Sequence, residues 1–239
     1  MTLFAFIGLG DMHSPMASNL VDAGHTVRVF DLNTEAVQTA ADFGALPAES
    51  LAESVKDVDV AITMLPAGTH VRSVCNELCD RVYPKTLQID SPTVDIGTSQ
   101  WCHEQAKQHG LRFVDAPVSR GISGAKAATL AFMVGGDPSD VEQARKHLSP
   151  MARQTFASGG PTSGAAAKIV NNLMAHIHLL ANAEGSQLAA KLGLDPKIFH
   201  AVVSASSGRS WVQQTWYPVP QIITTSAADR NFDATFRAE

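Results

Sequence analysis

Long uninterrupted apolar runs are missing from this sequence. The longest uncharged run within its most apolar stretch, Ile169 to Ala183, is shorter than the roughly 20 residues that a membrane-spanning helix needs, and it contains Asn and His. We therefore expect no membrane span. An apolar run that begins at Leu3 leaves no room for a signal or transit peptide, so we expect a cytoplasmic protein or one already processed.

Cysteine is scarce, and neither sign of charge dominates. The three cysteines, Cys75, Cys79 and Cys102, form no C-x-x-C pattern, so we expect reduced thiols and no metal site. A net charge of −5 argues against a nucleic-acid partner. No internal repeat, low-complexity tract or charge run is present. With 239 residues, 45% of them hydrophobic, the chain can form one large domain or two modest ones that act on small molecules.

The chain opens with an apolar run, Leu3–Ile7, that leads directly into a glycine turn and then into a helical pattern. A second apolar run, 26–30, closes on Asp31. The turn is formed by Gly8, Leu9, Gly10, Asp11 and Met12. In a dinucleotide-binding βαβ unit the glycines permit the turn and the approach of the pyrophosphate, and an acid about 20 residues further on binds the ribose hydroxyls. This order of strand, glycine turn, helix, strand and acid predicts dinucleotide binding; the alternative is an ordinary strand-turn-helix. NAD is favoured over NADP, because Asp31 would repel the 2′-phosphate of NADP.

The alternation of strand and helix patterns continues beyond Asp31. We expect strands at 58–64, 86–90, 111–115 and 129–134, and helices at 34–43, 48–55, 69–81 and 95–109. Such alternation predicts a Rossmann-type, doubly wound and mostly parallel sheet. The segment 91–93, which includes Thr93, caps the carboxyl end of the expected strand 86–90, where open α/β sheets bind their ligands, and Leu65 and Pro66 follow the expected strand 58–64.

The stretch Gly164 to Gly193 is apolar on nearly every face and predicts a long buried helix that connects two domains. Lys168 is the only charge in its first half. Asn172 lies one helical turn further on, on the same face, and Asn171 lies beside it. A lysine in a buried helix needs partners or must lose its proton. The alternative is that Lys168 extends to water and that the two Asn residues satisfy neighbouring backbone groups.

The best domain boundary is the break at 159–161, before this helix. We expect a nucleotide-binding domain at 1–161, the connecting helix at 162–193 and an incomplete all-α second domain at 194–239. Asp195 and Pro196 predict the start of a further helix. Near the end of the chain, aromatic residues would need a partner surface that the chain does not supply: Trp211, Trp216, Phe232 and Phe236.

A small polar loop, 115–124, lies between two expected strands. It is either a plain connection or a backbone cradle for a carboxylate, to which the Ser119 hydroxyl would also point.

Taken together, these segments resemble the β-hydroxyacid dehydrogenase family over almost the whole chain. The matching stretches are 8–20, 63–68, 115–121, 132–136 and 167–172, while 206–220 is similar to the branch of the family that acts on 3-hydroxyisobutyrate. The resemblance implies NAD-dependent oxidation of 3-hydroxyisobutyrate to methylmalonate semialdehyde, a step of valine catabolism, by a homo-oligomer. Related activities on tartronate, glyoxylate or succinate semialdehyde remain the alternative.

The resemblance also implies roles for the residues. Lys168 would be the catalytic acid/base with Asn172 beside it, and Ser119, Gly121 and Asn171 would bind the substrate. The expected cofactor-binding residues are Gly8, Leu9, Gly10, Asp11, Met12, Asp31, Leu65, Pro66 and Thr93.

Three departures from the family pattern favour a second reading, a catalytically impaired NAD-binding remnant. His13 replaces the last glycine of the nucleotide fingerprint, and we expect it to displace the helix or to lie over the phosphate groove. Arg120 replaces a glycine of the substrate loop, where it could block the site or bind a larger anion. The sequence stops at Glu239, before a family segment of the form Leu-Met-x-Lys-Asp-Leu, so we expect part of the connecting helix and Trp211 to be exposed.

Overall fold

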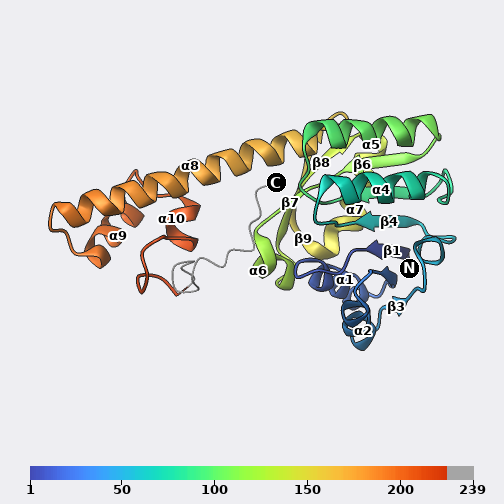
Figure 1. The fold of residues 1–239 in the computed structure, drawn as a ribbon, viewed down its shortest axis with the longest axis horizontal. Helices are drawn as coiled ribbons and strands as arrows, with labels where there is room; N and C mark the ends of the chain where they lie inside the picture. The colour runs from blue at the N-terminus through green and yellow to red at the C-terminus, as the bar shows by residue number, and fades with distance from the viewer. Residues whose placement is uncertain (225–239) are drawn as a thin grey trace. The chain divides into compact units, whose positions relative to one another are not determined.

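The computed structural model describes residues 1–224, which fall into two compact units, Met1–Ile169 and a second unit that starts at Val170 (Figure 1). The first unit is built on one nine-stranded sheet, in which the strands follow the order β3-β2-β1-β4-β5-β6-β8-β7 and β9 pairs with β8. The strands are β1 (Leu3–Ile7), β2 (Thr26–Phe30), β3 (Leu46–Pro47), β4 (Val60–Thr63), β5 (Leu87–Asp90), β6 (Arg112–Asp115), β7 (Val118–Ser119), β8 (Leu130–Gly136) and β9 (Ala152–Gly159). The predicted Rossmann-type sheet is confirmed.

The strands from β3 to β6 are all parallel, and β8 runs antiparallel to β6 and β7. From β1 the chain first adds β2 and β3 on one side and then returns to add β4 on the other. The order therefore reverses between β1 and β4, and in open α/β sheets this point, at the carboxyl ends of the strands, is where ligands bind.

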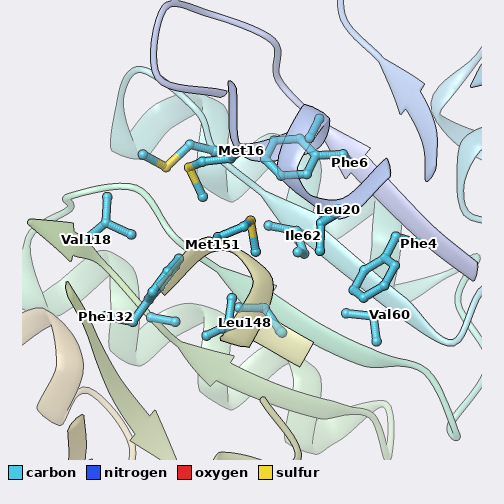
Figure 2. Close-up of a cluster of buried hydrophobic side chains, with 14 of the residues drawn as sticks. Phe4, Phe6, Met16, Leu20, Val60, Ile62, Val118, Phe132, Leu148 and Met151 are labelled. Atoms are coloured by element: carbon cyan, nitrogen blue, oxygen red, sulfur yellow. The ribbon is translucent and has the colours of Figure 1, made fainter. Parts of the chain in front are cut away.

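Successive side chains of each strand enter two different cores, because the side chains of a strand alternate between the faces of the sheet. In β1, Phe4 and Phe6 belong to the larger core, whereas Ala5 and Ile7 belong to a second core on the opposite face. Figure 2 shows the larger core, in which Met16 and Leu20 of a helix lie near Phe6 and Ile62. With helices on both faces, the central strands are almost wholly buried.

Helices cover both faces of the sheet, and α4 packs beside α5 (Figure 1). The helices of the first unit are α1 (His13–Asp22), α2 (Thr34–Asp42), α3 (Leu51–Ser54), α4 (Gly68–Cys79), α5 (Ile96–Gln108), α6 (Gly121–Lys126), α7 (Pro138–Leu148) and the 3₁₀ helix η1 (Ser149–Met151). Asn33 and Asp95 cap α2 and α5, since their side chains accept hydrogen bonds from first-turn amides. The predicted bounds of these two helices were accurate to within one residue.

Several elements of this unit differ from the expectation. The two-residue strands β3 and β7 were not predicted, and β7 lies within the expected loop 115–124. Residues 152–159 form β9, which we did not predict, because half of its residues are polar and the sequence shows no regular alternation of apolar and polar residues. The end of the expected loop, 121–124, instead forms most of the short helix α6, which continues to Lys126.

The long connecting helix is α8 (Ser163–Lys191), which is continuous over 29 residues. Gly164, Ala165 and Lys168 are buried, but the expectation of a buried helix is wrong for most of its length: Val170, Leu173, Ile177 and Leu180 are 53–64% exposed. The sequence shows that these side chains are apolar, but whether another surface buries them depends on the tertiary structure.

The second unit continues with α9 (Pro196–Ala205), for which Asp195 is the N-cap as predicted, and α10 (Trp211–Thr215). Trp211 is 49% exposed, as expected, and its ring lies 5.0 Å from that of Trp216 in an edge-to-face arrangement. The expectations for Phe232 and Phe236, and for the end of the second domain, lie outside the described residues.

Candidate active site

The glycine turn lies at the switch point between β1 and β4. Gly8 has φ +94°, and a Cβ there would approach the Met64 carbonyl oxygen to 2.2 Å. Only glycine fits, because both the backbone conformation and the contact exclude a side chain. The Gly8 amide donates to the Phe30 carbonyl at 3.0 Å and so ties the turn to β2.

Asp31, at the carboxyl end of β2, is held in place by the same turn. Its Oδ2 accepts a hydrogen bond of 2.6 Å from the Leu9 amide, and its Oδ1 accepts one of 2.7 Å from the Asn33 amide. Each carboxylate oxygen keeps a further lone pair, so Asp31 can still accept hydrogen bonds from ribose hydroxyls.

The turn and the N-terminus of α1 present backbone donors for an anion. Among residues 1–224 the amides of Asp11 and Met12 have no acceptor, and no side chain caps α1. Unpaired amides at a helix N-terminus suit a pyrophosphate. The residues of this turn therefore fit the predicted dinucleotide.

His13 does not displace the helix, since α1 begins at His13 itself and its Met16, Ala17 and Leu20 are buried in the core. Its imidazole instead lies against the glycine turn, where Nδ1 accepts a hydrogen bond of 2.9 Å from the Gly10 amide. Burial lowers the pKa of His13 to about 4, although the carboxylates of Asp31 and Asp11 oppose the shift. The ring is therefore neutral at pH 7 and its Nε2 carries the proton.

The other predicted cofactor residues follow strands at the same edge of the sheet. Leu65 comes after β4, and its Cδ2 would lie 3.3 Å from a Cβ on Gly8. Pro66 and Thr93 are exposed in the loops that follow β4 and β5.

Beyond β6, the predicted substrate loop reaches Ser119 at the end of β7 and Gly121 at the start of α6, and both are partly exposed. Arg120 between them is exposed and has φ +94°, a left-handed conformation that disfavours any residue with a Cβ. The strain comes from a side chain at a backbone conformation that suits glycine.

Lys168, in the second turn of α8, is 7% exposed. Among residues 1–224 its amine has no hydrogen bond or ion pair, and burial alone lowers its pKa from 10.5 to about 8. A buried amine of this kind is a base that can be used near neutral pH. Asn171 and Asn172 continue the same helix into the second unit, where Asn171 is exposed and Asn172 is partly buried.

Sequence reasoning missed the residues that anchor the start of α8. Asp115, at the end of β6, accepts hydrogen bonds from His103 and from two amides at the start of the helix. In the sequence Asp115 is only the first residue of the polar loop 115–124, and His103 gives no signal, because the pair joins a helix to a strand that no local pattern connects.

A second buried acid lies beside Asp115 in the sheet. Asp90 is paired with Asp115 in the β5–β6 register and accepts a hydrogen bond of 2.5 Å from the Thr63 hydroxyl. Burial raises the pKa of Asp90 to about 7; the Thr63 hydrogen bond opposes this shift, and the Asp115 charge adds to it.

Neither a metal site nor a membrane-spanning helix is found in the described part of the chain. No group of three or more His, Cys, Asp or Glu side chains within residues 1–224 is arranged to hold a metal ion. Over the same residues, no helix combines the length and apolar character required to cross a membrane.

The switch-point turn, its free amides and Asp31 define a dinucleotide-binding protein of the Rossmann class. Residues 3–160 match the family described as the NAD binding domain of 6-phosphogluconate dehydrogenase. Residues 162–239 match the family described as NAD-binding of NADP-dependent 3-hydroxyisobutyrate dehydrogenase.

Similar proteins match along nearly the whole chain. The 3-hydroxyisobutyrate dehydrogenase of Pseudomonas aeruginosa is 40% identical over 240 residues, which cover 99% of this chain and 80% of that protein. The NAD-dependent L-serine dehydrogenase of the same species is 37% identical over 242 residues, 100% of this chain and 81% of that protein. The solved structure of Mycobacterium tuberculosis 3-hydroxyisobutyrate dehydrogenase with L-serine superposes with a TM-score of 0.92 at 43% identity and covers 99% of this chain and 81% of that one.

The chain belongs to the β-hydroxyacid dehydrogenase family. It is an NAD-dependent 3-hydroxyacid dehydrogenase, and the prediction of NAD as its cofactor is confirmed.

Proposed function

We propose that this protein oxidises 3-hydroxyisobutyrate to methylmalonate semialdehyde, as a step of valine catabolism, with Lys168 as the acid/base. The observation that carries the proposal is the Lys168 amine, which is buried, has no partner within residues 1–224 and has a pKa of about 8. We extend the proposal to a cytoplasmic homo-oligomer.

Oxidation of a primary alcohol requires that its hydroxyl proton be removed while a hydride leaves the adjacent carbon. Neutral Lys168 would accept this proton, and in the reverse direction the ammonium would return it. NAD, when bound, supplies the hydride acceptor. Gly8, the amides of Asp11 and Met12, and Asp31 would hold the dinucleotide, with Leu65, Pro66 and Thr93 around it.

The substrate carboxylate needs hydrogen-bond donors. Ser119 and the backbone around Gly121 are the proposed donors, and Asn171 and Asn172 would orient the substrate and the Lys168 amine. Asn172 follows Lys168 by four residues in a continuous helix, so the two share a face of α8.

L-Serine is the second candidate substrate, because one close relative is an L-serine dehydrogenase and the superposed structure was solved with L-serine. Both candidates are 3-hydroxy acids with a primary alcohol, and they differ in a methyl group against an ammonium group. Arg120 adds a positive charge to the proposed carboxylate loop, and this charge favours the substrate without an ammonium group.

Purified protein with NAD and 3-hydroxyisobutyrate should form NADH, detected by its ultraviolet absorbance, with a higher kcat/KM than with L-serine. The kcat/KM for oxidation should rise with pH to a plateau above about 8, because Lys168 must be neutral to accept the proton. Lys168→Ala should lower kcat at least about 100-fold, the usual contribution of a general base.

The matched control is Lys126→Ala, which removes an exposed lysine of the same unit. Turnover that survives in Lys168→Ala would exclude the mechanism. If calorimetry detects NAD binding but no hydroxy acid is turned over, the protein is instead a catalytically impaired NAD-binding remnant. If tartronate, glyoxylate or succinate semialdehyde is reduced faster than methylmalonate semialdehyde, the related reductase activities are supported.

A further inference from the structure

We infer that His103 is a positioning residue: through the Asp115 carboxylate it holds the first turn of α8, and with it Lys168, at the edge of the sheet. The inference rests on the proposed role of Lys168. All of the residues involved lie in the first unit.

Asp115 connects three elements. Its Oδ1 lies 2.7 Å from His103 Nε2 on α5, and the same oxygen accepts a hydrogen bond of 3.1 Å from the Thr162 amide. Its Oδ2 accepts one of 2.7 Å from the Ala165 amide in the first turn of α8. The carboxylate is 2% exposed, so these donors replace the water that it loses on burial.

The backbone at the start of α8 is strained and closely packed. Thr162 has φ +70°, which is unfavourable for a β-branched residue and persists only where the surroundings impose it. A Cβ on Gly164 would approach the Met133 carbonyl to 2.3 Å and the Asp115 carbonyl to 2.6 Å. The helix therefore starts in direct contact with β6 and β8, and Asp115 binds the amides on both sides of this contact.

His103 is the one side chain that hydrogen-bonds Asp115 within the described residues, and its Nε2 is the donor because a carboxylate only accepts. The other two donors are backbone amides, of which that of Thr162 also lies 3.3 Å from His103 Nε2. Its side chain is 10% exposed, and its ring packs edge-to-face on Phe113 at 4.8 Å. The imidazole thus fixes the orientation of the carboxylate that caps α8. Loss of this donor leaves Asp115 free to rotate away from the Thr162 amide, and the strained residue can relax.

Asp90 and Asp115 are neighbours in the sheet, but their surroundings differ. Among the residues that the structure describes, Asp90 has one side-chain donor, Thr63, whereas Asp115 has His103 and two amides. Asp115 faces the N-terminus of α8, where the helix dipole favours a carboxylate.

Lys168 lies three residues after Ala165, one turn along α8. Within residues 1–224 its amine has no hydrogen bond or ion pair, so the position of Lys168 depends first on the helix that carries it. Misplacement of a catalytic group by about 1 Å can cost up to about 100-fold in rate.

The test compares His103→Leu with His103→Gln. Leucine keeps an apolar contact for Phe113 but removes the donor, whereas the glutamine amide nitrogen is as many bonds from Cα as Nε2 and can restore the hydrogen bond. For His103→Leu we expect kcat for the hydroxy acid to fall about tenfold with NAD affinity unchanged, and amide hydrogen exchange to accelerate over residues 162–168. His103→Gln should recover both properties.

Three results would overturn the inference: His103→Leu with wild-type kcat and exchange, parallel loss of NAD affinity and thermal stability with kcat, or failure of His103→Gln to recover. Hydrogen exchange is measured without turnover. If Lys168→Ala remains active, the proposed function fails while the exchange data still decide whether His103 holds the start of α8.

Discussion

At the scale of single residues, the burial of Lys168 lowers the stability of the folded protein and also makes its amine a better base near neutral pH. Its pKa is lower in the folded protein, about 8, than the ordinary 10.5, so the unfolded chain binds the proton more strongly. Between these two values the free energy of unfolding rises with pH. At pH 7 the buried ammonium therefore costs up to about 3 kcal/mol.

Lys168→Met should remove this cost while it retains most of the side-chain volume. We expect the free energy of unfolding at pH 7 to rise by about 1 to 3 kcal/mol while activity is lost, and the gain over wild type to shrink as pH approaches 10.5. Urea unfolding at pH 7 and at pH 10 measures both effects. Lys126→Met, at an exposed position, is the control and should change little; a destabilised Lys168→Met would contradict the account.

At the scale of elements, the first turn of α8 depends on glycine at a helix–sheet contact. The atoms that a Gly164 side chain would meet are mainly backbone carbonyls of Met133 and Asp115, which cannot rotate away. The sequence contained the glycine, but only the structure reveals which strands lie against it.

Gly164→Ala should therefore displace α8 from the sheet. We expect a loss of about 1 to 3 kcal/mol in the free energy of unfolding, as for overpacked sites, with a larger relative loss in kcat than in NAD affinity. Gly160→Ala is the matched control, because a Cβ at Gly160 has no heavy atom within 4 Å. Equal stability of the two variants would show that the contact can relax.

Element prediction succeeded where a local pattern was strong. The strands β1, β2, β4 and β5 were predicted with small errors at their ends, because each carries buried apolar side chains in a strand-like pattern. β9 and α6 were missed, because a largely exposed strand and a six-residue helix carry weak local patterns. Their conformation depends on pairing with β8 and on packing against it, respectively, which no local window contains.

At the scale of the whole molecule, the second unit leaves many large apolar side chains exposed. They lie along α8, α9 and the segments that follow, and include Val170, Leu173, Met174, Ile177, Leu180, Leu188, Leu192, Ile198, Val202 and Trp211. Exposed apolar surface of this extent indicates association.

We predict that the protein is a homo-oligomer at micromolar concentration and that a Leu173→Lys/Ile177→Lys double variant dissociates it. The two positions are four residues apart, so both charges lie on one face of α8. Sedimentation velocity gives the oligomeric state. Gln187→Lys adds a charge at an exposed polar position of the same helix and should leave the state unchanged. A monomeric wild-type protein would refute the prediction.

The sequence alone determined the class of sheet, the glycine turn, Asp31 and the helix that carries Lys168, because each depends on a local pattern or on a residue with few conformational alternatives. Tertiary structure decided that His13 accepts the Gly10 amide, that Asp115 joins His103 to the start of α8, and that most of α8 is exposed. Hydrogen bonds between distant residues, and burial, are set by which surfaces meet, and this depends on the path of the whole chain.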